Sequence, residues 1–125
     1  MTFLELTVVI VVLLSLLTIF FIGARAWKKG SDRSVNILNL YNVQHAVRGH
    51  ANIHVLAIGA PLAPSAIIGP DKYLTSVTSP NLDITYLGKF DSVIPPVGTL
   101  YLNPGYSNAT AISDFAPVLG SYAQW

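Results

Sequence analysis

The sequence predicts an α+β protein: a long N-terminal α-helix, apolar in its first half and amphipathic in its second, followed by a small antiparallel β-sheet head and an irregular C-terminal tail. Three observations predict this fold. Residues 6–24 form an unbroken run of apolar, small and hydroxyl side chains, apolar residues then recur at helical spacing, and all eight prolines lie at or after Pro61. We therefore divide the chain into an apolar helix half (1–24), an amphipathic helix half (25–59) and a β-containing head with its tail (60–125).

The apolar run of residues 6–24 is close to the roughly 20 residues that a helix needs to cross a bilayer. It lacks the basic start, short apolar core and convincing cleavage site of a secretory signal, so we interpret it as a retained membrane-spanning helix. Four cations follow it, at positions 25, 28, 29 and 33, and the positive-inside rule would leave the remainder in the cytoplasm. Yet the remainder is rich in Ser, Thr, Asn, Gly and Pro, as exported domains are. A basic leader removed ahead of Met1 would resolve this conflict.

A single carboxylate, Glu5, stands at the edge of the apolar run. An ionised side chain in a membrane helix costs roughly 2.5–3.5 kcal/mol on insertion scales and usually has a partner. Helix geometry puts Glu5 on the same face as the amino group of Met1, but poorly aligned to neutralise it within one chain. In a bundle of staggered helices, Glu5 could instead reach the amino group of a neighbouring molecule. The alternative is a carboxylate that only stabilises the start of its own helix, where the helix dipole favours it.

The amphipathic half is predicted from apolar residues at 3-4-4 spacing, with polar residues mostly on the other side. Gly59 followed by Pro61 is a stop signal, and we predict one helix from about Met1 to about Val55, roughly 80 Å long. The predicted buried face consists of Leu40, Val43, Val47 and Ala51, and the polar side of Asn39, Asn42, Arg48 and Asn52.

Two runs rich in β-formers, residues 83–90 and 98–103, predict the antiparallel sheet, with residues 91–97 as their connection. The tail from residue 104 to 125 is predicted to be irregular. A sheet of two or three strands is marginal alone. We therefore expect the apolar residues of the tail to contact neighbouring molecules; they are Phe115, Val118, Leu119, Tyr122 and Trp125.

The composition argues against several functions. A net charge of +1 does not favour a nucleic-acid partner, and the absence of cysteine excludes disulfides and thiolate sites. We expect no cofactor and no catalysis, because no nucleophile–base arrangement or phosphate loop is visible. His50 and His54 have the i, i+4 spacing of a metal pair, but no third ligand is near them in sequence, so we expect an exposed polar face and no metal site.

Two further features of the head are weaker signals. Asp83, Asp91 and Asp114 could offer oxygen ligands, but their spacing fits no recognised calcium loop. The sequon that begins at Asn108 is a possible glycosylation site on an exported surface.

The first ten residues, MTFLELTVVI, resemble the mature N-terminus of type IV pilins and of the related pseudopilins of type II secretion. The resemblance implies that a prepilin peptidase removes a short leader and methylates the new amino group, here that of Met1. It also identifies Glu5 with the carboxylate at position five that marks this family. The family more often begins with Phe, so Met1 is a departure. Residues 25–33 and 42–48 look like the second helical half of short bacterial pilin-like proteins, and the C-terminal half matches only loosely.

The resemblance implies a major structural subunit of a type IV pilus, a helical filament subunit without enzymatic activity. Its partners would be identical subunits, joined through the N-terminal helix with Glu5 paired to Met1 of a neighbour, and the prepilin peptidase and pilus assembly machinery. The subunit would be held in the inner membrane and then exported as a surface filament, and part of the helix between Leu14 and Gly23 could unwind on assembly. A secretion pseudopilin and a single-span anchored binding protein are the alternatives.

Overall fold

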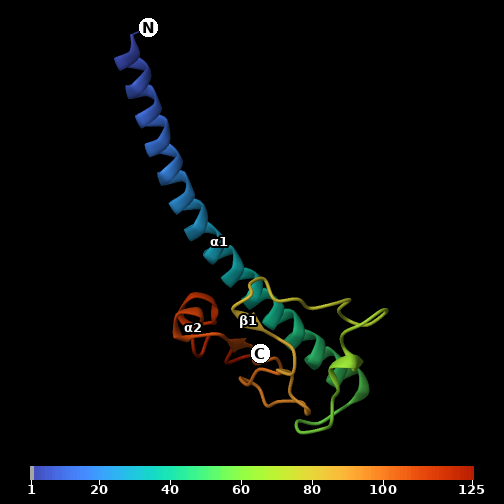
Figure 1. Cartoon of the computed structure of the whole chain (residues 1–125). Coiled ribbons are helices and arrows are strands. Elements are labelled where there is room, and N and C mark those ends of the chain that lie inside the picture. Colours follow the sequence, from blue (N-terminus) through green and yellow to red (C-terminus); the bar gives the residue numbers. More distant parts are fainter. Residues whose placement is uncertain (1) are drawn as a thin grey trace.

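A computed structural model describes residues 2–125 of the chain. The dominant element is the helix α1 (Phe3–His54), whose N-terminal half projects away from the rest of the molecule in Figure 1. The head surrounds the C-terminal half of α1 and contains a short 3₁₀ turn, two short strands and one further helix. These elements are η1 (Pro64–Ala66), β1 (Ile84–Thr85), β2 (Gly105–Tyr106) and α2 (Ala109–Phe115). The predicted α+β layout is thus confirmed in outline.

The helix α1 ends at His54, close to the predicted end at about Val55. Val55 adopts the left-handed conformation, with φ 53°, and the N–H groups of Val55 and Leu56 both donate to the main-chain oxygen of Ala51. A left-handed residue interrupts the i→i−4 ladder, and hydrogen bonds back to the last turn satisfy its free carbonyls. The amphipathic half therefore ends at His54, and Gly59 lies in the loop that follows, where its N–H donates to the oxygen of Ile94.

The helix is continuous through Leu14–Gly23 in the single chain. Ser15 and Thr18 donate their hydroxyl protons to the main-chain oxygens of Val11 and Leu14, one turn earlier, at 3.0 and 2.9 Å. These bonds satisfy the hydroxyls inside an apolar segment and leave the backbone ladder intact. Unwinding of this segment concerns the assembled state and stays a prediction.

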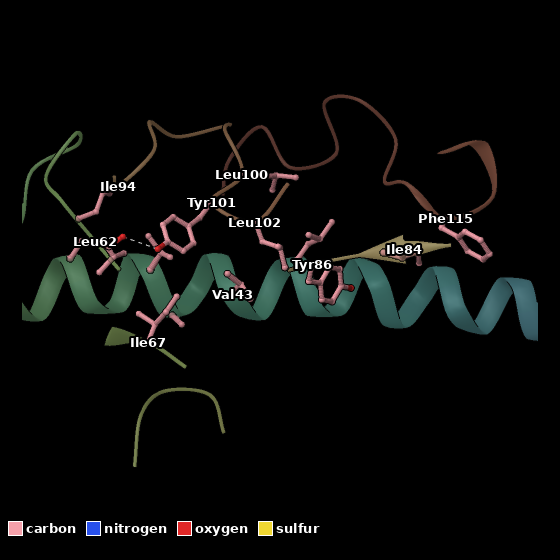
Figure 2. Packing of buried hydrophobic residues seen from close by; sticks show 14 of the residues in the cluster. Val43, Leu62, Ile67, Ile84, Tyr86, Ile94, Leu100, Tyr101, Leu102 and Phe115 are labelled. Atoms are coloured by element: carbon pink, nitrogen blue, oxygen red, sulfur yellow. Dashed lines mark hydrogen bonds between the residues drawn. The ribbon is translucent and has the colours of Figure 1, made fainter. Parts of the chain in front are cut away.

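The predicted buried face of α1 is confirmed: Leu40, Val43, Val47 and Ala51 are all buried. They pack against head residues, most of which lie above α1 in Figure 2, with Ile67 below it. Tyr101 is fully buried there, and its hydroxyl donates to the main-chain oxygen of Leu62 at 2.8 Å. The other head residues of this core are Ile67, Ile84, Tyr86, Ile94, Leu100, Leu102, Ala111 and Phe115.

The sheet is smaller than predicted and its second strand lies later. Strands β1 and β2 pair antiparallel, with Ile84 opposite Tyr106 and Thr85 opposite Gly105. A turn at Gly88, with φ 70°, interrupts this pairing, which resumes only as a single bridge between Phe90 and Leu102. The predicted run 83–90 therefore contains β1, whereas the run 98–103 contributes one bridge and no strand.

The prediction of an irregular tail is wrong for residues 109–115, which form α2. Asn108 caps this helix, because its side-chain oxygen accepts the N–H of Ala111 at 2.8 Å. The cap directs Phe115, only 3% exposed, into the core of its own head, so the expectation that it contacts a neighbour is wrong. Tyr122 and Trp125 also pack partly against this core, and Val118 and Leu119 stay exposed.

Buried polar side chains of α1, which the sequence pattern did not single out, attach the head to the helix. Asn36 is fully buried; its Nδ2 donates to the oxygen of Phe115 at 2.9 Å, and its Oδ1 accepts the hydroxyl of Tyr86 at 2.6 Å. Gln44 is buried as well and bonds both Thr99 and Tyr101 through their main chain. Main-chain N–H and C=O groups of the head loops that are buried against α1 need hydrogen-bond partners, because an unsatisfied buried polar group is costly. The side chains of Asn36 and Gln44 supply these partners.

Candidate assembly interface

The first half of α1 is an uncovered apolar surface. The most apolar 18-residue window of the helix has none of its residues buried, and by length and composition α1 is able to cross a membrane. Phe20, Phe21 and Ile22, for example, are each more than half exposed. Such a continuous apolar surface is unfavourable in water. It therefore needs lipid, other helices, or both in succession to cover it.

Glu5 takes part in a capping box at the start of α1. Its carboxylate oxygen Oε2 accepts the N–H of Thr2 at 3.2 Å, and its own N–H donates to the hydroxyl of Thr2 at 3.3 Å. The carboxylate thus satisfies a free donor of the first turn and lies at the positive end of the helix dipole. The T-x-x-E spacing of residues 2–5 carried this signal in the sequence.

The predicted pair between Glu5 and the amino group of Met1 falls outside the described residues, because Met1 is not among them. In the described residues, Glu5 stabilises the start of its own helix, which was the alternative interpretation from the sequence. Leu4, Val8 and Val9 line a shallow apolar hollow of about 310 Å³ together with Glu5. The carboxylate therefore stands next to an apolar surface that another helix could cover, with one oxygen, Oε1, not engaged in the cap.

The histidine pair lies at the far end of α1. The rings of His50 and His54 are 4.3 Å apart between centroids, and Tyr73 packs edge-on against His50. Nδ1 of His50 is buried without a hydrogen-bond partner. Burial lowers the pKa of His50, and the neighbouring His54 and Lys72 lower it further. Within residues 2–125, no group of three His, Cys, Asp or Glu side chains is placed to hold a metal ion.

The three aspartates of the head have separate local partners. Asp83 accepts the hydroxyl of Ser107 at 2.8 Å, Asp91 accepts the N–H of Ser92 at 2.7 Å, and Asp114 pairs with Lys29 at 3.6 Å. Asp91 thus shapes its own loop, Asp83 links its turn to Ser107, and Asp114 links α2 to α1.

The possible glycosylation residue, Asn108, is exposed at the start of α2. Its Oδ1 forms the helix cap, and its Nδ2, the atom that a glycan would modify, donates to the hydroxyl of Ser107 at 3.2 Å. A glycan on Nδ2 would leave the capping oxygen free to act. Modification of this residue stays a prediction.

Arg48 holds the end of the chain against α1. Its guanidinium donates to the main-chain oxygens of Pro95, Pro96 and Trp125, the last at 3.1 Å. Burial lowers the pKa of Arg48. With Tyr41 and Trp125, Arg48 lines a half-open hollow of about 490 Å³. The sequence placed Arg48 on the polar side of the helix; the structure gives it a role in attaching the head.

Comparisons with protein-family models, with curated proteins and with solved structures found no match for this chain. The geometry of α1 and the resemblance of the first ten residues are the features of this chain that indicate a function.

Proposed function

We propose that this chain is the major structural subunit of a type IV pilus, which is held in the inner membrane and polymerises through α1 into an extracellular helical filament. The observation that carries the proposal is the division of one continuous helix into two halves. The head covers α1 only from about Asp32 onward, whereas the preceding apolar half is bare and has Glu5 at its tip.

The length of the bare segment supports a polymer of packed helices. At about 1.5 Å per residue, residues 3–31 extend over roughly 43 Å, and the whole of α1 over roughly 78 Å. The hydrocarbon core of a bilayer is about 30 Å thick, which matches the apolar run 6–24. Neighbouring copies of the same helix would offer equally apolar surfaces along the run 6–24. The bare half can thus be stored in lipid and later be covered by other subunits.

The role of Glu5 in assembly is the part of the proposal that a single experiment can decide. As a member of the capping box, Glu5 would act within its own chain; as a partner of a neighbouring amino group, it would act through its negative charge. A paired carboxylate in a low-dielectric interface is far less costly than an unpaired one, so charge pairing would set the stagger between subunits. Glutamine retains an oxygen that can cap the helix but has no charge.

We therefore compare Glu5→Gln, Glu5→Ala and Thr2→Ala, each as the sole subunit in cells that assemble the wild-type filament. We expect both Glu5 variants to stay in the membrane fraction and to lose most of the filament yield. Thr2→Ala should assemble nearly as well as wild type, because the loss of a cap costs only about 1 kcal/mol and leaves the charge in place. Filament yield is measured by shearing and electron microscopy, and insertion by carbonate extraction.

Normal filament yield from Glu5→Gln would contradict charge pairing and leave the capping box as the role of Glu5. The wild-type images also separate the alternative functions. Long surface fibres support the pilus, short periplasmic polymers support a secretion pseudopilin, and a wild-type protein that never polymerises supports an anchored binding protein.

A further inference from the structure

The segment of α1 that follows the apolar run carries a group of exposed cations. At about 100° of rotation per residue, Arg25, Lys28 and Lys29 lie within an arc of about 100° on one side of the helix. All three are exposed. Trp27 is 76% exposed and lies on the other side of the helix. The cations therefore form a continuous surface, which we call the cationic belt (Arg25, Lys28 and Lys29).

The head compensates only part of this charge. Lys29 pairs with Asp114 at 3.6 Å, and within residues 2–125 this is the one salt bridge. Lys28 lines a shallow hollow beside the loop 79–83, which holds Asp83, but forms no ion pair with it. Arg25 lies one turn closer to the apolar run. Arg25 and Lys28 thus form no salt bridge in the described part of the chain. Asp32 follows Lys28 by one turn on the same side of α1, but it is buried and accepts a hydrogen bond from Asn81 at 2.9 Å.

The belt lies at the depth of lipid headgroups if the run 6–24 spans the membrane. That run extends over roughly 28 Å, close to the hydrocarbon thickness of about 30 Å. Arg25 and Lys28 then follow within about 6 Å, inside the headgroup layer. Helical side chains lean toward the N-terminus, which brings both charged ends back toward the phosphates. Trp27 at the same level is a typical interfacial anchor.

We propose that the cationic belt binds anionic phospholipid headgroups of the phosphatidylglycerol type while the subunit is held in the membrane. Clusters of Lys and Arg next to a membrane-spanning helix attract anionic lipids, whereas zwitterionic headgroups offer no net charge. The belt would set the depth of the helix in the bilayer, and the lipids would be released when the subunit leaves it. This inference rests on the membrane-held stage of the proposed function.

Energy transfer from Trp27 to labelled lipids tests the inference on the full chain. Trp125→Phe leaves Trp27 as the sole tryptophan, since the chain has two. The protein is reconstituted in phosphatidylcholine vesicles with a trace of pyrene-labelled phosphatidylglycerol or pyrene-labelled phosphatidylcholine. We expect the anionic label to be enriched around the helix roughly fivefold, which corresponds to the attraction of an anionic lipid by one surface cation. The enrichment should be smaller at high salt.

Two double variants in the Trp125→Phe background test the assignment to the belt. Arg25→Gln with Lys28→Gln should lower the enrichment to about one. The charge-matched control replaces two exposed lysines of the head, Lys72→Gln with Lys89→Gln, and should leave the enrichment unchanged.

The outcomes separate failure of the inference from failure of the proposed function. Equal transfer to the two labels in the parent protein would overturn lipid selectivity and leave the membrane-held stage intact. Enrichment that persists in the Arg25 and Lys28 variant would overturn the assignment to the belt. No transfer to either label would show that Trp27 is not at a membrane, which overturns the membrane-held stage and the inference with it.

Discussion

Replacing Asn36 by leucine should detach much of the head from α1, because this fully buried side chain links three parts of the molecule. Its Nδ2 donates to the oxygen of Phe115 at 2.9 Å and to the hydroxyl of Tyr106 at 3.1 Å. Its Oδ1 accepts the hydroxyl of Tyr86 at 2.6 Å. Leucine has the same branching and number of side-chain heavy atoms, although its methyl groups are bulkier, and it leaves all three groups without this partner. The substitution therefore removes the hydrogen bonds while keeping the branched shape of the side chain.

The magnitude follows from which of the three groups can find another partner. A buried polar group left unsatisfied costs about 1–3 kcal/mol. The oxygen of Phe115 is left without this donor, and the hydroxyl of Tyr86 loses the acceptor of its proton, although it still accepts a hydrogen bond from Asn39 at 3.3 Å. Tyr106 is only partly buried and can turn toward water. We expect a loss of about 3 kcal/mol, a large share of the roughly 5–15 kcal/mol that stabilises a domain. The midpoint of thermal unfolding should fall by roughly 12–24 °C for a head of this size.

Urea unfolding of the full chain in a non-denaturing detergent, followed by near-ultraviolet circular dichroism, measures the loss. The detergent covers the apolar half of α1, and the aromatic signal reports the head. The matched control is Asn39→Leu, which removes one bond to the exposed oxygen of Thr78 and one to Tyr86. The control should cost less than about 1 kcal/mol. A loss of under about 0.5 kcal/mol for Asn36→Leu, or equal losses for the two variants, would refute the reasoning.

Two further predictions concern the filament and the response to pH. Filaments should survive about 1 M sodium chloride, where the screening length is about 3 Å, and dissociate in detergent. The reason is that the bare apolar half offers far more contact area between subunits than the charged residues, which make up 10% of the chain. Dissociation by salt alone would contradict this. Burial, aided by the negative charge of Asp91, raises the pKa of Tyr101 from 10.0 to about 12. Because the native state retains this proton while the unfolded chain releases it, stability should be unaffected below about pH 10 and fall as the pH rises from there to about 12. Tyr101→Phe should lessen this alkaline loss in urea titrations, and an unchanged loss would show that Tyr101 does not cause it.

The sequence predicted the features that depend on local periodicity and composition. The apolar run, the buried face from Leu40 to Ala51 and the end of α1 close to Val55 all follow from side chains a few residues apart on one helix. The capping box of Thr2 and Glu5 has a local T-x-x-E signal in the sequence but was not predicted. The left-handed cap at Val55 was not predicted either, because a left-handed β-branched residue has no local signature.

The features that the sequence could not predict depend on residues far apart in the chain. In the sequence, Asn36 is indistinguishable from the other polar residues of an amphipathic helix. Its buried position depends on Phe115, which is 79 residues later in the chain and accepts its hydrogen bond in the structure. The sequence likewise predicts that Arg48 is exposed, whereas in the structure the end of the chain packs against it.

What the sequence by itself determined is the bare apolar half of α1 with one carboxylate at its tip, because no later residue is needed to make that surface. What only the tertiary structure decided is how the head is attached: which polar groups become buried, that Phe115 faces inward and not toward a neighbour, and that β2 lies at residues 105–106. The physical reason is that buried polar groups and short strands gain stability only from partners that the completed fold brings together.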